Sequence, residues 1–442
     1  MYRFIPYVTM IMGAATVICT SYPLPCPAAE TSPVVITLAA GLKEATEESR
    51  LVKIAAYNPE IASAEAAREF ARFLPSVNAS AGQTWLSNQP GAIAGTTSFY
   101  TGQRSSFSYA VTAQQTLFDF GGRTSRYRAA QASLEGARQD MQRIRNLVAL
   151  DYIASHFNLL ETDKMVMVAE KELESLLGHV KMAAALYREG VITKNDLLQA
   201  KVKLSDTQQR LIAVRNQQKL ATASLNTILA RPLGTPLRAA EVDYDLTTPF
   251  GLEQAWKKAE EKRPEIAVIN NEIIAADLQA RAKKADYFPT VIAQGGYSYG
   301  ENRYQLHQEN WSLMLGVSLN IFSGGATKAE VAKLTYRRDQ LAEQKRKLLD
   351  DIRLEVEKWY RDEENARERV AATRDAIAQA EENLRITRVR YREGVGTATD
   401  VLDAITLRTL SETNYYRALY DMRRSHAGLL YAIGEELVSI YR

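Results

Sequence analysis

The sequence predicts an α+β membrane protein with an internal duplication, and three observations support this prediction. First, Tyr-Arg-Glu-Gly-Val at residues 187–191 recurs at 391–395, an offset of 204 positions, and Phe-Gly-Gly at 120–122 has a counterpart in Ser-Gly-Gly at 323–325, an offset of 203. Second, each copy contains two segments in which apolar and polar residues alternate. Third, each copy contains a helical segment that is far too long for an ordinary globular domain. A repeat on this scale decides how every other segment is interpreted.

A secretory signal peptide is predicted at residues 1–29. No charged residue lies between Arg3 and Glu30, and an apolar stretch is followed by small residues, so cleavage is expected near Ala28 or Ala29. An N-terminal membrane anchor is the alternative, although the apolar stretch is short for a helix that spans a bilayer.

Both cysteines, Cys19 and Cys26, fall within this signal, so the mature chain is predicted to contain no disulfide and no cysteine metal site. Lipid attachment to one of them is a further alternative, but neither follows the small residue that such sites prefer. The chain has 55 Lys and Arg against 52 Asp and Glu, a formal net charge of +3. This balance gives no indication of nucleic-acid binding.

The first copy is predicted to occupy residues 30–233 and the second residues 251–442, with an irregular, Pro-containing connector at 234–250. The second copy begins with a helix over residues 252–285.

Pro-Glu-Ile occurs before the strands in both copies, at residues 59–61 and 264–266. The first of these prolines precedes Pro75 by 16 residues, whereas the second precedes Pro289 by 25. The first ascending helix is therefore predicted to be about two and a half turns shorter than the second.

Four strands are predicted, two in each copy, because apolar residues recur at every second position. The four segments are residues 77–85, 107–117, 291–299 and 311–321. Polar loops at 88–104 and 300–310 join them into two hairpins. A tilted strand of this length spans the hydrocarbon of a bilayer. A hairpin of a soluble sandwich has the same alternation and is the alternative.

A long helix is predicted after each hairpin, over residues 123–188 and 326–392, which contain no Pro and almost no Gly. At ~1.5 Å per residue each would be about 100 Å long. In the second helix, small and apolar residues recur at heptad spacing. These residues are Ala366, Val370, Thr373, Ile377, Ala380 and Leu384.

A return helix is predicted after each glycine turn, so that each long helix becomes one arm of an antiparallel hairpin. Thr193 and Thr397 are placed as N-caps, with Asp196 and Asp400 three residues later, as in a capping box. The return helices are expected to end near residues 229 and 433.

Four strands cannot close a barrel, and each unpaired backbone group at an open edge costs several kcal/mol in lipid. If the strands enter a membrane, neighbouring chains must complete the wall, as in an outer membrane. The alternative is a soluble periplasmic coiled-coil scaffold or adaptor protein whose strands never enter lipid.

The chain resembles the TolC family of outer-membrane efflux and secretion proteins over essentially the whole mature sequence. The resemblance is carried by the duplicated plan and by four motifs: Phe-Asp-Phe-Gly-Gly (118–122), Ile-Phe-Ser-Gly-Gly (321–325), Tyr-Arg-Glu-Gly-Val-Gly-Thr (391–397) and Asp-Val-Leu-Asp-Ala (400–404).

The resemblance implies a homotrimer in which four strands per chain form a 12-stranded outer-membrane β-barrel, continued by a long periplasmic α-helical coiled-coil barrel. It further implies a passive exit duct of a tripartite efflux pump or type I secretion system, which passes small molecules, drugs or unfolded proteins to the exterior. The implied partners are outer-membrane lipid, a periplasmic adaptor (membrane fusion) protein and an inner-membrane pump.

The resemblance also implies a gate at the periplasmic mouth, lined by Asp400 and Asp403 in the second copy and by Asp196 and Gln199 in the first. Six carboxylates from three chains would raise some pKa values and attract cations. Gly396 stands where some members have a basic latch residue, so closure by the same ionic latch is not implied. The alternative for Asp400 is an ordinary helix-start residue favoured by the helix dipole.

The two helical turns are the predicted contact with the adaptor, and the alternative is that their leucines only pack the hairpin core. The residues are Gly190, Thr193, Leu197, Leu198, Gly394, Thr397, Val401 and Leu402.

No enzymatic site, metal or cofactor is predicted, because the histidines are scattered and no phosphate-binding loop or nucleophile elbow is present. The histidines are His156, His179, His307 and His426. The aromatic residues of the strands are typical of membrane interfaces. They are Trp85, Tyr109, Tyr297, Tyr299 and Trp311.

Overall fold

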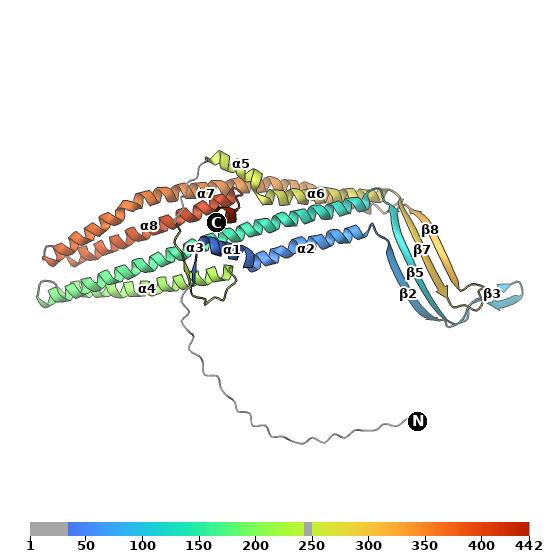
Figure 1. Cartoon of the computed structure of the whole chain (residues 1–442), viewed down its shortest axis with the longest axis horizontal. Coiled ribbons are helices and arrows are strands. Elements are labelled where there is room, and N and C mark those ends of the chain that lie inside the picture. The colour runs from blue at the N-terminus through green and yellow to red at the C-terminus, as the bar shows by residue number, and fades with distance from the viewer. Residues whose placement is uncertain (1–33, 243–249, 442) are drawn as a thin grey trace, which may run out of the picture.

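The computed structural model describes residues 34–242 and 250–441, and it places a β-sheet at one end of a layer of long helices (Figure 1). The predicted signal peptide, residues 1–29, lies outside the described residues. No helix within the two described ranges is both long and apolar enough to cross a membrane.

Two helices of equal length, α3 (Gly122–Arg188) and α7 (Ala326–Arg392), run from the sheet to the far end of the molecule (Figure 1). Each has 67 residues. The return helices α4 (Lys194–Ile228) and α8 (Ala398–Ala432) have 35 residues each and pack along the distal halves of α3 and α7. The two predicted helical hairpins are confirmed, and every member of the predicted heptad series in α7 is buried or half-buried.

The half of each long helix nearer the sheet is covered by a helix that precedes the strands. α2 (Arg50–Ala71) packs on α3, and α6 (Pro264–Lys284) lies between α3 and α7. α2 has 22 residues and α6 has 21, so the predicted shortening of the first ascending helix is wrong. Pro264 lies in the first turn of α6, but Pro59 lies inside α2, where the helix tolerates the loss of one hydrogen bond.

A shorter helix of 11 residues precedes each ascending helix: α1 (Leu38–Glu48) and α5 (Leu252–Lys262). The single helix predicted over residues 252–285 is therefore wrong, because the chain breaks at Arg263, whose ψ is 120°. A residue before proline is driven out of the helical region by contact with the proline ring. A 3₁₀ turn, η1 (Ala285–Tyr287), then leads into the strands.

The main sheet has four antiparallel strands in the order β2-β5-β7-β8. β2 (Ser76–Trp85) pairs with β5 (Ser105–Phe118), and β7 (Thr290–Gly300) pairs with β8 (Glu309–Ser318), which confirms the two predicted hairpins. Pairing of β5 with β7 joins the two halves of the chain. β8 ends at Ser318, three residues before the predicted end. β2 and β8 are the open edges of the sheet.

Each strand of the main sheet is continuous with one helix, and the two layers have the same order. α2 leads into β2, β5 leads into α3, α6 leads into β7 through η1, and β8 leads into α7. The helices beside the sheet pack in the order α2-α3-α6-α7. The edges of the sheet are therefore continued by the edges of the helical layer.

Two small sheets were not predicted. β3 (Gly91–Ala94) and β4 (Thr97–Tyr100) form a hairpin within the first polar loop. β1 (Val34–Ile36) pairs in parallel with β6 (Leu237–Ala239), so the predicted irregular connector at 234–250 contains a strand. Strands of three or four residues are too short to show a periodic pattern.

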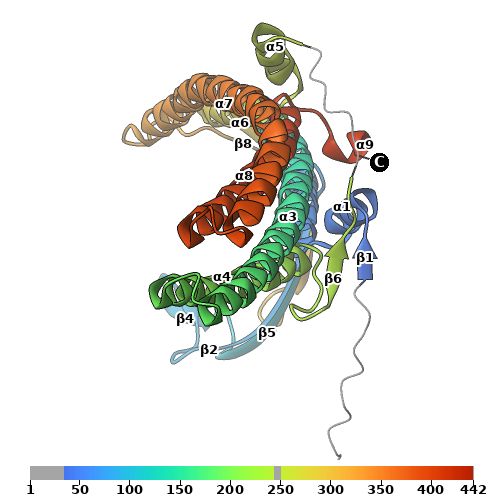
Figure 2. The same ribbon diagram turned by 90° about the vertical axis from the view of Figure 1, so that its left-hand side faces the viewer.

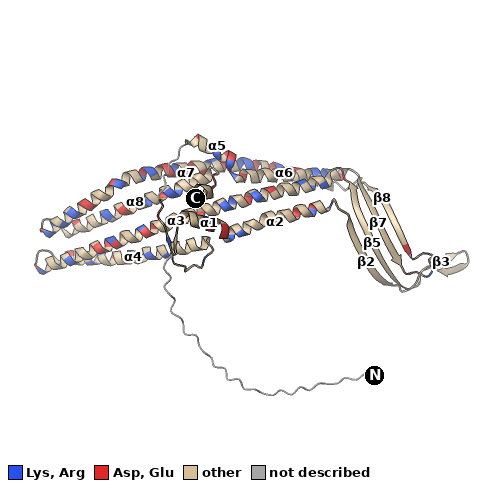
Figure 3. Ribbon diagram, in the orientation of Figure 1, with Lys and Arg blue, Asp and Glu red and all other residues tan. Residues whose placement is uncertain are grey.

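The helices form one curved layer (Figure 2). Seen from the helical turns, α7, α8, α3 and α4 follow an arc, and α1, β1, β6 and α9 (Leu437–Ile440) lie on its convex side. The largest buried cluster joins this side group to α3, α4 and α8. Charged residues cover the helices, whereas the four strands of the main sheet contain one, Glu309 at the loop end of β8 (Figure 3).

The joints between strand and long helix have the same backbone conformation in both halves. The N-cap residues Gly121 and Gly325 have φ values of 84° and 86°, and the preceding Phe120 and Gly324 have values of 50° and 61°. These left-handed values favour glycine. Gly121 thus corresponds to Gly325, at the same 204-residue offset as the turn motifs, and not to Gly324 as the sequence comparison suggested.

His156 of α3 lies at the centre of the largest buried cluster. Its Nε2 lies 3.1 Å from the carbonyl oxygen of Ala240, and its Nδ1 lies 3.3 Å from the hydroxyl of Tyr152. Burial is the main reason that the pKa of His156 is lowered, from 6.5 to about 4.

Acidification should therefore destabilise this cluster. The unfolded chain binds the proton of His156 more tightly than the folded chain, so the contribution of neutral His156 to stability is complete above pH 6.5 and is lost as the pH falls toward 4. Denaturant midpoints measured at pH 7.5 and 5 should differ less in His156→Gln than in the parent. His307→Gln, in an exposed loop, is the control. Equal pH dependence in the parent and both variants would contradict this assignment.

Gly428 of α8 lies against the indole ring of Trp359 of α7, where a Cβ atom would lie 2.5 Å from two ring carbons. We expect Gly428→Ala to lower the free energy of unfolding by about 1–3 kcal/mol, the usual cost of overpacking. The matched control is Gly178→Ala in α3, where a Cβ atom meets nothing within 4 Å. It gains helix propensity without a clash and should be neutral or slightly stabilising in thermal unfolding. Equal destabilisation by both substitutions would refute the packing argument.

Candidate functional site

The strand register places most of the apolar residues of the four strands on one face of the main sheet. Residues directly opposite each other in an antiparallel pair share a face. Val111 of β5 is opposite Ala79 of β2 and Tyr297 of β7, and Tyr297 is opposite Trp311 of β8. Leu313 on this face is 82% exposed. The other face carries mainly small and polar residues, including Ser80, Thr112, Gln294 and Ser312.

Aromatic side chains form a band at each end of this apolar face. At the loop end, the rings of Tyr109 and Tyr299 are 5.1 Å apart, and those of Tyr297 and Trp311 are 4.9 Å apart. Such bands mark the two surfaces of the bilayer in outer-membrane barrels.

The band at the helix end was not predicted from the sequence. There, the ring of Phe120 meets that of Phe118 edge to face and stacks on that of Phe288, with ring centres 4.8 and 4.9 Å apart. Phe118 and Phe120 lie at the end of β5, whereas Phe288 precedes β7, so the contact between them depends on the pairing of distant segments. Phe118 lies nine positions after Tyr109, about 30 Å along β5 at ~3.3 Å per residue, which on a strand tilted by about 40° is close to the apolar band of about 25 Å in outer-membrane barrels.

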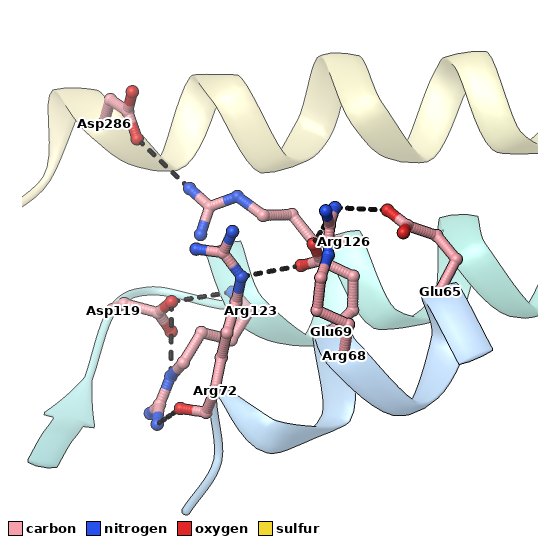
Figure 4. A network of polar contacts seen from close by, with 8 residues as sticks. All are labelled: Glu65, Arg68, Glu69, Arg72, Asp119, Arg123, Arg126 and Asp286. Carbon is pink, nitrogen blue, oxygen red and sulfur yellow. Dashed lines mark hydrogen bonds and ion pairs between the residues drawn. The ribbon is translucent and has the colours of Figure 1, made fainter. Parts of the chain in front are cut away.

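A polar network fixes the joint between the sheet and the helices (Figure 4). Arg123, at the start of α3, donates from Nη1 to the carbonyl oxygens of Thr116 (2.6 Å) and Arg72 (3.3 Å), and its Nε lies 3.4 Å from Asp119. Its guanidinium also lies 5.2 Å from the ring centre of Phe73. One side chain thus connects the ends of α2 and β5 with the start of α3.

Both predicted capping boxes are present at the helical turns. The backbone N–H of Thr193 donates to Asp196 (3.1 Å), and that of Thr397 donates to Asp400 (2.9 Å). The bond from the Thr397 backbone, helped by its side chain and by the charge of Arg390, lowers the pKa of Asp400. Within one chain, Asp400 is therefore held in its charged form.

The structure brings Asp400 and Asp403 together with Arg390 and Gly396 in one open groove of about 430 Å³. Asp196 and Gln199 lie at the other turn and do not line this groove. Arg390 was missed by the sequence analysis because it lies on α7, and its approach to Asp400 depends on how α7 and α8 are aligned. Arg390 places a positive charge beside Gly396, which stands where some family members have a basic residue.

The proposed adaptor contacts divide into exposed and buried residues. Val401 is 1% exposed and packs with Leu176 of α3 and Leu384 of α7, so it stabilises the hairpin core and cannot be a surface contact. Leu197 and Leu402 are half-buried. The exposed members are Gly190, Thr193, Leu198, Gly394 and Thr397. Val191 and Val395, which follow the two turn glycines, are exposed as well and were not predicted.

The described part of the chain contains no group of three or more His, Cys, Asp or Glu residues that could hold a metal ion.

An open sheet with one apolar face, two aromatic bands and long helices continuing its strands defines a subunit of an outer-membrane channel. The chain matches the outer membrane efflux protein family over residues 41–231 and 255–435 and belongs to this family. It is therefore located in the outer membrane, and its general function is that of an efflux channel. The soluble scaffold considered above is set aside.

Relatives of known function include the alkaline protease secretion protein AprF of Pseudomonas aeruginosa, 25% identical over 353 residues, which are 76% of this chain and 72% of the relative. The cation efflux system protein CusC of Escherichia coli O157:H7 is 22% identical over 395 residues, 86% of this chain and 83% of the relative.

Solved structures with the same fold include the outer-membrane channel OprN, with a TM-score of 0.79 at 17% identity, covering 91% of this chain and 90% of that one. A CusC structure has a TM-score of 0.79 at 18% identity and covers 90% of this chain and 92% of that one.

Two adjacent residues of β8 provide a test of the membrane-facing surface. We expect Leu313→Lys, on the apolar face, to reduce the amount of folded protein in the outer-membrane fraction, since a lysine in the hydrocarbon costs about 2–4 kcal/mol. Ser312→Lys, on the polar face, should be tolerated. The readout is the quantity of heat-resistant protein in that fraction. If both lysines reduce it equally, the assignment of faces is wrong.

Proposed function

We propose that three copies of this chain close a 12-stranded barrel in the outer membrane and that the barrel continues into a periplasmic helical tunnel. The single observation that carries the proposal is the open pair of edges, β2 and β8, on a sheet with one apolar face. In lipid, edge N–H and C=O groups find no water, so they must pair with strands of sister chains.

The edges of the helical layer support the same arrangement. On α2, Ile54, Tyr57 and Ile61 are spaced three and four residues apart and are exposed along one face. On α7, at the opposite edge, Tyr336 and Leu354 are exposed. Because strand and helix orders match, the neighbour that pairs β2 with β8 would also bring α2 against α7. The apolar side chains on both edges would then be buried.

The proposed duct passes its cargo along the polar face of the sheet and the concave face of the helical layer. The helical turns would contact a periplasmic adaptor protein, which connects the duct to an inner-membrane pump. Known relatives are named for alkaline protease secretion and for cation efflux. The wall of a duct makes few cargo-specific contacts, so the pump would select the cargo. The two halves of the chain, with long helices of equal length, would derive from one duplicated unit.

The gate of the proposed duct is the groove that contains Asp400 and Asp403. In a trimer, three such grooves would surround the axis at the narrow end of the tunnel. Arg390 would balance part of the negative charge there. It would take the role of the basic residue that some family members have at the position of Gly396.

The assembly is tested by the mass of the purified protein in detergent and by its conductance in a planar bilayer. The account predicts three chains per particle and ohmic channels. A water-soluble monomer from the periplasmic fraction, with no conductance, would rule it out.

The gate is tested by the double variant Asp400→Asn with Asp403→Asn. Removal of these carboxylates should weaken block of the single-channel current by magnesium ions about tenfold or more, since divalent cations bind oxygen ligands that carry charge. Asp206→Asn, an exposed carboxylate farther along α4, should leave the block unchanged. Unchanged block in the double variant would remove these two residues from the gate.

A further inference from the structure

A second cavity, of about 510 Å³, lies between the two helical hairpins and shares no lining residue with the groove at the turn of α7 and α8. It is lined by residues of α3, α7 and α8, including Lys171, His179, Arg388, Tyr391 and Arg408. None of these residues was assigned a functional role by the sequence analysis. The cavity therefore needs its own explanation.

Two almost fully buried polar side chains line this cavity without a hydrogen-bond partner in the described chain. His179 is 4% exposed and Tyr391 is 2% exposed. Neither Nε2 of His179 nor the hydroxyl of Tyr391 has a partner among the described residues, and their rings lie 5.2 Å apart. A buried polar group without a partner costs about 1–3 kcal/mol. Two at one cavity indicate that something in the cavity bonds to them.

The charges around the cavity are predominantly positive. Arg388, Arg392 and Arg408 line it, against Glu174 and Glu381, and the fourth lining cation, Lys171, is paired with Glu412 (3.3 Å). Arg388 and Arg408 have no hydrogen bond or ion pair with any side chain that the structure describes. Burial, with a further contribution from the charge of Arg408, lowers the pKa of Arg388, while Glu174 acts in the opposite direction.

The buried groups without a partner at this cavity, on His179, Tyr391 and Arg408, can all donate hydrogen bonds, whereas the carboxylates of Glu174 and Glu381 are exposed. Arginine can only donate, and the tyrosine hydroxyl has its hydrogen available. Burial, with a smaller effect of Arg388, lowers the pKa of His179 to about 4, so at neutral pH this ring is uncharged and can present one N–H. The hydroxyl of Ser175 is already used, because it donates to the carbonyl oxygen of Lys171 (2.8 Å). The missing partner is therefore an acceptor with negative charge.

We propose that this cavity binds a small oxyanion of the phosphate class, held by the guanidinium groups of Arg388 and Arg408 and by the N–H of His179 and the hydroxyl of Tyr391. Charge-assisted bonds from arginine to phosphate oxygens are among the strongest hydrogen bonds in proteins. The bound anion would connect α3 of the first hairpin to α7 and α8 of the second. Binding at this site does not depend on conduction through the duct.

Titration calorimetry of the full-length protein in detergent, with inorganic phosphate against chloride of equal ionic strength, tests the proposal. Saturable phosphate binding is expected, with affinity reduced at least tenfold in Arg388→Gln and in Arg408→Gln. The matched control is Arg385→Gln, an exposed arginine of the same helix that pairs with Glu382 outside the cavity, and it should bind as the parent does. Glycerol phosphate in parallel distinguishes a site for the free ion from one that also accepts a phosphate ester.

Tyr391→Phe is a second test of the site, which remains informative if an arginine variant fails to assemble. It removes only a hydroxyl that has no protein partner, so the fold should be unchanged while phosphate affinity falls several-fold. Absence of phosphate binding in the parent would overturn the proposal. So would binding that Tyr391→Phe and the arginine variants leave unaltered, because the ion would then occupy another place.

Discussion

The structure depends on one constraint, the unpaired backbone groups along β2 and β8. Inside the sheet, β5 and β7 are paired on both sides, whereas each edge strand is paired on one side only. In water these groups would be solvated, but the apolar face and the two aromatic bands place this sheet in lipid, where no such solvent exists. This is the reason for proposing that several chains together form the functional unit.

Closing the sheet in the membrane would also determine how the helices outside the membrane meet. Because each strand of the main sheet is continuous with one helix in the same order, closing the sheet also brings the edges of the helical layer together. The left-handed joints at Gly121 and Gly325 and the contacts of Arg123 fix the direction in which the helices leave the sheet. The largest buried cluster, which surrounds His156, packs the helical layer against α1, β1, β6 and α9 on its convex side.

The sequence predicted those features that depend on local pattern. The helical hairpins, both capping boxes and the four strands follow from heptad spacing, Thr-x-x-Asp and alternation. Features that depend on contacts between distant segments were missed: the pairing of β1 with β6, the second aromatic band, and the approach of Arg390 to Asp400. The length of α2 was predicted wrongly because Pro59, in the repeated Pro-Glu-Ile, was aligned with Pro264 at the start of α6, whereas Pro59 lies inside α2. Val401 was taken for a surface residue because the sequence does not show which side of α8 faces α3.

Disulfide cross-linking between edge strands tests the central claim most directly. Both natural cysteines lie in the predicted signal peptide, so introduced cysteines should react only with each other. Ser80→Cys on β2 would be combined in turn with Ser312→Cys and Met314→Cys on β8, which lie on the same face of the sheet. We expect at least one pair to yield covalent trimers on oxidation of outer membranes, as analysed on non-reducing gels, and the single variants to yield none. Monomers alone from every pair would contradict closure of the barrel between chains.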